Sequence, residues 1–169
     1  MFKDRKEAGQ KLAERLRGYA GTHAVVLALP RGGVVTGFEI ARTLKLPLDI
    51  VAVRKIGHPT NPEYAIGAVD ENGTTILNEA ETKAVDRSWL KEETGRQKQE
   101  AKRRSSAYRE GKEPLGLAGE IVIIVDDGIA TGLTMRRAVL SAKVQKPEKV
   151  IVAVPVAPAG ALRALKDEG

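Results

Sequence analysis

The sequence predicts an α/β fold, in which a central parallel β-sheet is flanked by helices on both faces. Four short apolar runs are typical of strands buried on both faces: residues 24–29, 47–53, 121–125 and 150–156. Helical patterns alternate with these runs, at residues 4–18, 34–44, 135–143 and from 158 onward. Alternating strands and helices indicate a parallel sheet, because a crossover helix must return the chain to the starting edge.

Two insertions interrupt this alternation. An Asn-Gly pair between short apolar segments predicts a β-hairpin over residues 66–77. A long polar helix is predicted over residues 79–110, with a break near Gly95.

Two prolines within residues 58–62 predict an irregular segment there. Asp4 and Glu7 have the spacing of a capping box, so the first helix is expected to begin there, pack on the sheet and carry no chemistry.

Length and composition set the class of protein. The 169 residues suit a single domain, 42% of them are hydrophobic and 30% charged, and the net charge is +6. The chain has no cysteine, so a disulfide framework and a thiolate metal site are excluded. We expect no membrane span and no signal peptide, and therefore a cytoplasmic protein. The positive charge permits an anionic partner, but aromatic residues make up only 4%, which argues against nucleic acid.

The most informative stretch is residues 121–134. Its strand ends at two adjacent carboxylates, Asp126 and Asp127, and open α/β sheets bind ligands at that end of their strands. The turn that follows opens the next helix, where free N–H groups and the helix dipole suit a phosphate. The predicted phosphate cradle consists of Ala130, Thr131, Gly132, Leu133 and Thr134.

Two other strand ends carry cationic or glycine-rich segments. The strand at residues 24–29 runs into Pro-Arg-Gly-Gly, in which glycine N–H groups can approach an anion and Arg31 adds a guanidinium. The strand at residues 47–53 is expected to end at Arg54 and Lys55. An ordinary tight turn and a solvated charge pair are the alternatives for these two segments.

Together these segments resemble the type I phosphoribosyltransferase family. Residues 122–134 are similar to that family's phosphoribosyl-pyrophosphate motif, although Gly128 stands where an aliphatic residue is usual. Residues 29–33 resemble its pyrophosphate loop, and residues 53–57 its downstream basic segment. Within that family, the chain resembles uncharacterised bacterial phosphoribosyltransferase-like proteins with a Pro-Arg-Gly-Gly loop. The resemblance implies a Rossmann-like sheet and one domain over residues 1–169, which either lacks a C-terminal strand or is cut before it.

The resemblance also implies a reaction and its residues. A nitrogen nucleophile, nucleobase-like, would displace pyrophosphate from 5-phosphoribosyl 1-pyrophosphate in the presence of Mg²⁺. Asp126 and Asp127 would be the catalytic acids and would hold Mg²⁺ through water or the ribose hydroxyls. The 5-phosphate would bind at the cradle of residues 130–134. The pyrophosphate would bind at Arg31, Gly32, Gly33, Arg54 and Lys55.

The acceptor is left open by the same comparison. In the family's 6-oxopurine enzymes an acid stands where Ala130 stands here, which argues against hypoxanthine or guanine. A hood over the base is expected in the family, and the hairpin at residues 66–77 is one candidate for it. A homodimer is also left open. The main alternative is a regulatory module that binds the same ligand without turnover.

Three further alternatives are weaker. A receiver domain would carry its acid pair after the first strand, whereas about 120 residues precede it here. Neither G-x-x-x-x-G-K-[ST] nor G-x-G-x-x-G, the two common nucleotide-binding motifs, occurs in the sequence. The basic residues between Arg96 and Lys112 are read as a solvated helix face, with a cleft rim or nucleic-acid contact as the alternative.

Overall fold

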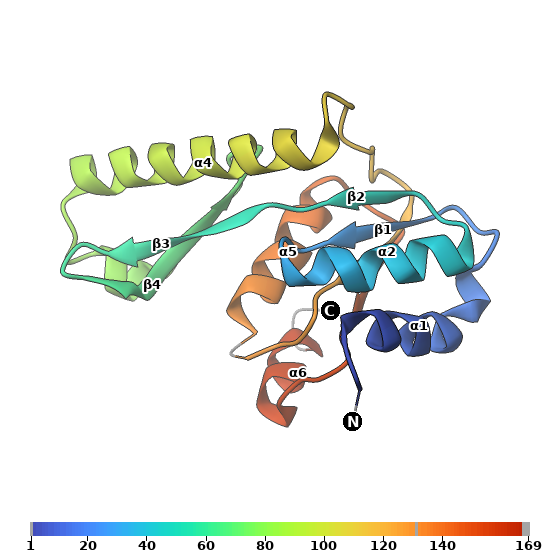
Figure 1. The fold of residues 1–169 in the computed structure, drawn as a ribbon. Coiled ribbons are helices and arrows are strands. Elements are labelled where there is room, and N and C mark those ends of the chain that lie inside the picture. Colours follow the sequence, from blue (N-terminus) through green and yellow to red (C-terminus); the bar gives the residue numbers. More distant parts are fainter. Residues whose placement is uncertain (1, 131, 167–169) are drawn as a thin grey trace. The chain divides into compact units, whose positions relative to one another are not determined.

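The chain forms two compact units, each with its own β-sheet (Figure 1). The structure is a computed structural model that describes residues 2–130 and 132–166. Unit 1 combines the described parts of residues 1–51 and 113–169, and unit 2 is residues 52–112. The predicted site residues are divided between the two units.

Unit 1 is built on four parallel strands in the order β2-β1-β6-β7. The strands are Ala24–Ala28 (β1), Leu48–Ile50 (β2), Ile121–Val125 (β6) and Lys149–Ala153 (β7). Every residue of β1 and β6 is buried, as their continuous apolar runs predict. These two strands pair from Ala24 with Ile121 to Ala28 with Val125, so the chain leaves both at the same edge of the sheet.

Helices cover both faces of this sheet, which confirms the predicted fold class. They are Arg5–Arg15 (α1), Gly32–Leu44 (α2), Leu133–Val144 (α5) and Ala159–Lys166 (α6), and a short 3₁₀ helix spans Arg17–Tyr19. Val26 and Ile123 pack in one core cluster with Ile40 of α2 and Ala13 of α1. Side chains alternate along a strand, so the intervening residues face the opposite side, where α5 packs on β6 and β7.

The start of α1 follows from its cap. Asp4 is the N-cap residue, and its side chain accepts a hydrogen bond from the Glu7 amide over 2.8 Å. The Glu7 carboxylate accepts from the backbone amide of Lys3 over 2.6 Å, which is one residue earlier than a capping box requires. The predicted helix start is therefore confirmed. Of the two hydrogen bonds of a capping box, only the one from the Glu7 amide to the Asp4 side chain forms as predicted.

Unit 2 is an antiparallel three-stranded sheet with a long helix on it. The elements are Val53–His58 (β3), Asn61–Asp70 (β4), Thr75–Leu77 (β5), Glu79–Thr82 (α3) and Arg87–Arg109 (α4). Its core consists of Ile56, Ile66, Val69 and Val85, with Trp89 packed against them. The predicted hairpin is confirmed as β4–β5, in which Gly73 has a φ of +94°, a value that favours glycine.

The structure corrects two predictions around β3. The run at residues 47–53 is not one strand, because β2 ends at Ile50 and β3 of the other sheet begins at Val53. Residues 58–62 are not an irregular segment but the tight turn that joins β3 to β4. A register shift at Gly57 accommodates Pro62 there, and a Cβ on Gly57 would overlap the Pro62 carbonyl.

The predicted helix break near Gly95 is also wrong. Helix α4 continues through Gly95, and the break lies before Arg87. The reason is a cap, because the Asp86 side chain accepts from the Trp89 amide over 2.8 Å and so starts a new helix. Neither α4 nor any other helix within the described residues is long and apolar enough to cross a membrane.

Candidate active site

Two predicted site segments meet at one edge of the unit 1 sheet. The glycine loop follows β1, the acid pair follows β6, and the two strands are paired neighbours. The Leu29 amide donates to the Val125 carbonyl over 2.9 Å, which extends the pairing to the last residue before the loop. The peptide bond between Pro30 and Arg31 is cis. Parallel pairing alone therefore brings together segments that lie about 100 residues apart in sequence.

The two glycines lie directly against the two acids. A Cβ added to Gly32 would overlap the Asp127 carboxylate. A Cβ added to Gly33 would lie 2.7 Å from the Val125 carbonyl oxygen and 2.9 Å from the Asp126 Cα. At Gly33 the obstructing atoms include backbone, whereas at Gly32 they belong to the Asp127 carboxylate, which would have to move; the loop and the acid pair thus form one closely packed surface. Gly32 and Gly33 also begin α2, where first-turn N–H groups have no helical acceptor.

The two carboxylates differ in environment. The pKa of Asp126 is raised to about 6, chiefly by burial and also by the neighbouring Asp127 carboxyl, while a hydrogen bond from the Asp127 amide lowers it. That amide donates to Asp126 Oδ1 over 2.8 Å, which fixes the orientation of the Asp126 carboxylate. The Asp127 side chain is 29% exposed, and both acids are half-buried.

The structure adds a residue that sequence reasoning missed. Arg5 donates its Nε–H to Asp127 Oδ2 over 2.6 Å. The first helix was expected to carry no chemistry, yet its first residue contacts the predicted catalytic acid. The capping signal at Asp4 places Arg5 in the first turn of α1, but nothing in the local sequence indicates a partner 122 positions away.

The phosphate cradle is described in part. Helix α5 begins at Leu133, and the preceding Gly132 has a φ of +83°. Ala130 and Thr134 are exposed, and Thr131 lies outside the described residues. Within the described residues, the cradle thus consists of a glycine in the left-handed backbone conformation followed by the N-terminus of a helix. Its phosphate-binding role stays a prediction.

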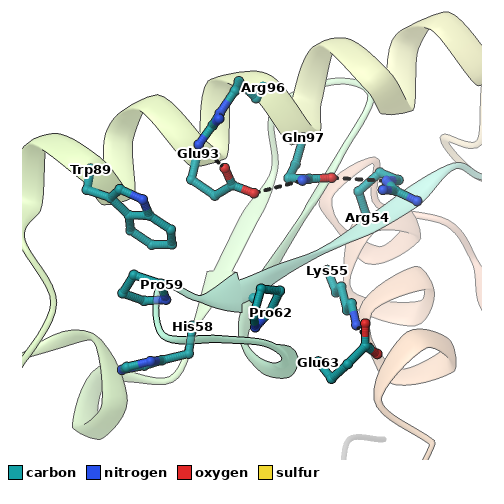
Figure 2. A pocket seen from close by; sticks show the side chains of 11 residues that line it. Arg54, Lys55, His58, Pro59, Pro62, Glu63, Trp89, Glu93, Arg96 and Gln97 are labelled. Carbon is teal, nitrogen blue, oxygen red and sulfur yellow. Dashed lines mark hydrogen bonds and ion pairs between the residues drawn. The ribbon is translucent and has the colours of Figure 1, made fainter.

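The two cations of the basic segment belong to unit 2 and point to opposite faces of its sheet (Figure 2). They lie within β3, rather than after a strand, and neighbouring residues of a strand alternate between faces. Arg54 donates to Gln97 of α4 over 3.1 Å, whereas Lys55 pairs with Glu63 over 2.8 Å. The two side chains therefore have different surroundings, which the prediction of a joint pyrophosphate site did not anticipate.

Comparison with known proteins identifies the family. The sequence profile of the phosphoribosyl transferase domain matches residues 2–167. The chain belongs to the phosphoribosyl transferase domain family. A protein of Mycobacterium tuberculosis, Rv0571c, which carries the provisional name of a phosphoribosyl transferase, is 42% identical over 160 residues. The match covers 94% of this chain but 36% of that relative, so the chain spans about a third of its length.

Solved structures share the fold. The crystal structure of TT1426 from Thermus thermophilus is 43% identical, with a TM-score of 0.84, and the match covers 99% of this chain and 81% of that one. A hypoxanthine phosphoribosyltransferase from Staphylococcus aureus is 12% identical, with a TM-score of 0.56 and coverage of 94% and 65%. At that identity the likeness concerns the fold alone.

Proposed function

We propose that the chain is the catalytic domain of a phosphoribosyltransferase that uses 5-phosphoribosyl 1-pyrophosphate, Mg²⁺ and a nitrogen nucleophile. The observation that carries this proposal is the close packing of Gly32 and Gly33 on Asp126 and Asp127. It puts backbone donors suited to a pyrophosphate beside carboxylates suited to ribose hydroxyls. A substrate with a pyrophosphate on C1 of a ribose needs both kinds of group.

The reaction would be a displacement at C1 of the ribose. The nitrogen lone pair forms the new C–N bond, the C1–O bond breaks, and its electron pair leaves with pyrophosphate, while the proton of the nucleophile passes to water or to the departing pyrophosphate. Asp127 and Asp126 would orient the ribose hydroxyls and stabilise positive charge that develops on the ring. Gly32 and Gly33 would donate N–H groups to the pyrophosphate, and the exposed Arg31 would neutralise it. The predicted cradle, which consists of Ala130, Thr131, Gly132, Leu133 and Thr134, would hold the 5-phosphate.

The acid pair also fits Mg²⁺. This ion prefers oxygen ligands, usually one or two carboxylates completed by water and substrate oxygens. Asp126 and Asp127 offer adjacent carboxylates, both of them half-buried. When bound, the ion would neutralise charge on the leaving pyrophosphate.

Lys55 is the cation of unit 2 that we assign to the pyrophosphate. Its amine is exposed and pairs with Glu63, whose side chain is 90% exposed. Exposed ion pairs contribute little free energy, so Lys55 could exchange its contact with Glu63 for one with a substrate phosphate at little cost. Arg54 instead lies against α4 and is bound to Gln97, so it is the weaker candidate for that role.

One observation favours a second function, a module that binds the sugar phosphate without turnover. Ala130 provides no acid or base for an acceptor at the position that follows the acid pair. Pyrophosphate release with a panel of nucleobases tests the two functions, with Asp127→Asn as the matched variant. Release with at least one base, lost in Asp127→Asn, supports the enzyme. Binding of phosphoribosyl pyrophosphate without release for any base supports the module, and no binding refutes both.

A further inference from the structure

Unit 2 contains a cavity of about 350 Å³ that the proposed reaction does not use. It lies between β3, the turn at Pro59, the start of β4 and the first half of α4 (Figure 2). All of its lining residues belong to unit 2. The volume is at the lower end of the range for small-molecule pockets, about 300 to 1,000 Å³, which suits a ligand of nucleotide size or smaller.

The charged groups on the cavity wall leave one cation without an anion. Three cations and two carboxylates line it, and two of the cations are paired: Arg96 with Glu93 over 2.5 Å, and Lys55 with Glu63 over 2.8 Å. No carboxylate within the described part of the chain forms an ion pair with Arg54. The cavity therefore carries a net positive charge that is concentrated at Arg54.

Arg54 is held in place by a chain of hydrogen bonds. Its Nε donates to Gln97 Oε1 over 3.1 Å, and Gln97 Nε2 donates to Glu93 Oε1 over 2.8 Å. Burial lowers the pKa of Arg54, and the nearby Arg104 lowers it further, while Glu100 and Glu93 oppose the shift. Glu100 is itself bound by Arg103 and Arg104. A guanidinium has five N–H donors, and among the described residues only Gln97 accepts from one of them, so the terminal nitrogens are available to an anion.

The other end of the cavity carries apolar rings together with His58. The Trp89 indole lies above the Pro59 ring in Figure 2, and Pro62 also lines the cavity. Trp89 is half-buried and rests on the core cluster of unit 2, which fixes the position of its ring. An aromatic ligand can stack on such a surface.

We propose that this cavity binds a small ligand that joins a flat aromatic ring to an anionic group, with the ring against Trp89 and the anion on Arg54. Nucleoside monophosphates have this chemistry, and so do aromatic carboxylates. We expect both parts of the ligand to contribute, because Arg54 forms no ion pair within the described residues and Trp89 is only half-buried. The proposal is independent of the reaction assigned to unit 1.

Trp89 is itself the probe, because it is the only tryptophan in the sequence. The experiment titrates the protein with adenosine monophosphate, benzoate, adenosine and inorganic phosphate, and follows tryptophan fluorescence. We expect a saturable change with the two aromatic anions. Adenosine and phosphate should bind at least about tenfold more weakly, since each lacks one of the two interactions. No saturable change with either aromatic anion overturns the proposal, and so does phosphate that binds as tightly as they do.

Variants locate the site. Arg54→Gln should weaken the binding of the aromatic anions about tenfold or more and leave the binding of adenosine unchanged. Lys91→Gln is the matched control, because it removes one exposed charge from the same helix outside the cavity, and it should change nothing. Asp127→Asn should also keep the response. A response lost in Asp127→Asn and kept in Arg54→Gln would overturn the proposal.

A second variant covers the case in which Arg54→Gln does not fold. Arg54→Lys keeps the charge but loses the planar fork that binds an anion with two N–H groups. We expect this variant to weaken the binding of the aromatic anions more than the binding of adenosine. Equal binding of all four ligands by Arg54→Lys and the unmodified protein overturns the assignment of Arg54.

Discussion

Arg5 Nε and Asp127 Oδ2 lie 2.6 Å apart, so the first turn of α1 supplies a cation to the proposed acid pair. The side chain of Arg5 is 59% exposed, so it can leave the pair when a ligand arrives. A cation bound to Asp127 competes with Mg²⁺ for the same carboxylate. This contact is therefore the one feature of α1 that bears directly on the proposed function.

The first prediction concerns this competition. Arg5→Ala should increase the affinity for Mg²⁺ a few-fold, since an exposed ion pair contributes up to about 1 kcal/mol. Calorimetric titration with Mg²⁺ measures this without any turnover. Arg15→Ala removes an exposed arginine at the far end of the same helix and serves as the control. Equal affinity in the Arg5→Ala and Arg15→Ala proteins would show that Arg5 does not compete.

The second prediction tests the packing of the glycine loop on the acids. Gly33→Ala should lower the free energy of unfolding by about 1 to 3 kcal/mol and impair pyrophosphate release, because the new Cβ meets backbone atoms of Val125 and Asp126. Urea unfolding and a release assay give the two values. Gly18→Ala is the control, since no atom lies within 4 Å of its added Cβ. Normal stability and activity in Gly33→Ala would contradict the close approach.

The third prediction concerns pH. Glu39 is buried, and its carboxylate accepts hydrogen bonds from Arg42 over 2.7 Å and Gln10 over 3.2 Å. The Arg42 hydrogen bond lowers the pKa of Glu39 below its ordinary 4.5, the Gln10 bond adds to this, and burial opposes it. The stabilisation is thus fully present above pH 4.5 and is lost as pH falls through the lowered folded-state value.

Glu39→Gln should therefore lower stability at neutral pH by about 1 to 3 kcal/mol and reduce the loss of stability below pH 4.5. Urea unfolding of both proteins across this range measures the difference. Glu14→Gln is the control, because Glu14 is an exposed carboxylate on α1, the helix that packs against α2. Parallel stability curves for the Glu39→Gln and unmodified proteins would rule out this role for Glu39.

The fourth prediction concerns a buried hydroxyl. Within the described residues, Thr36 Oγ1 is buried without a hydrogen-bond partner. Thr36→Val keeps the shape and removes the unsatisfied group, so it should raise the free energy of unfolding by about 1 kcal/mol. Thr94→Val removes a hydroxyl that donates to the Leu90 carbonyl over 2.7 Å, and should not stabilise the protein. A clear loss of stability in Thr36→Val would mean that the hydroxyl is satisfied.

Features that depend on neighbours in sequence were predictable from the residues alone. The run at residues 121–125 indicates a buried strand, and it is one. Asp4 marks the start of α1, and Asn72 with Gly73 marks the turn of a hairpin. The helix start and the hairpin turn depend on interactions between residues close together in sequence. The strand depends on a pattern of burial along a single element. The order of these elements was enough to indicate a parallel sheet.

The tertiary structure decided which distant groups meet. The sequence predicted Arg54 and Lys55 at one site, but the course of the chain from β2 into a second sheet put them within a strand, on opposite faces. The contact between Arg5 and Asp127 left no local signal either, because it depends on how α1 packs beside the sheet edge. The acid pair and the glycine loop could be proposed from sequence, whereas their direct contact follows only from the pairing of β1 with β6. Local chemistry thus determined the elements and their likeness to a family, and long-range packing determined the arrangement of charge around the site.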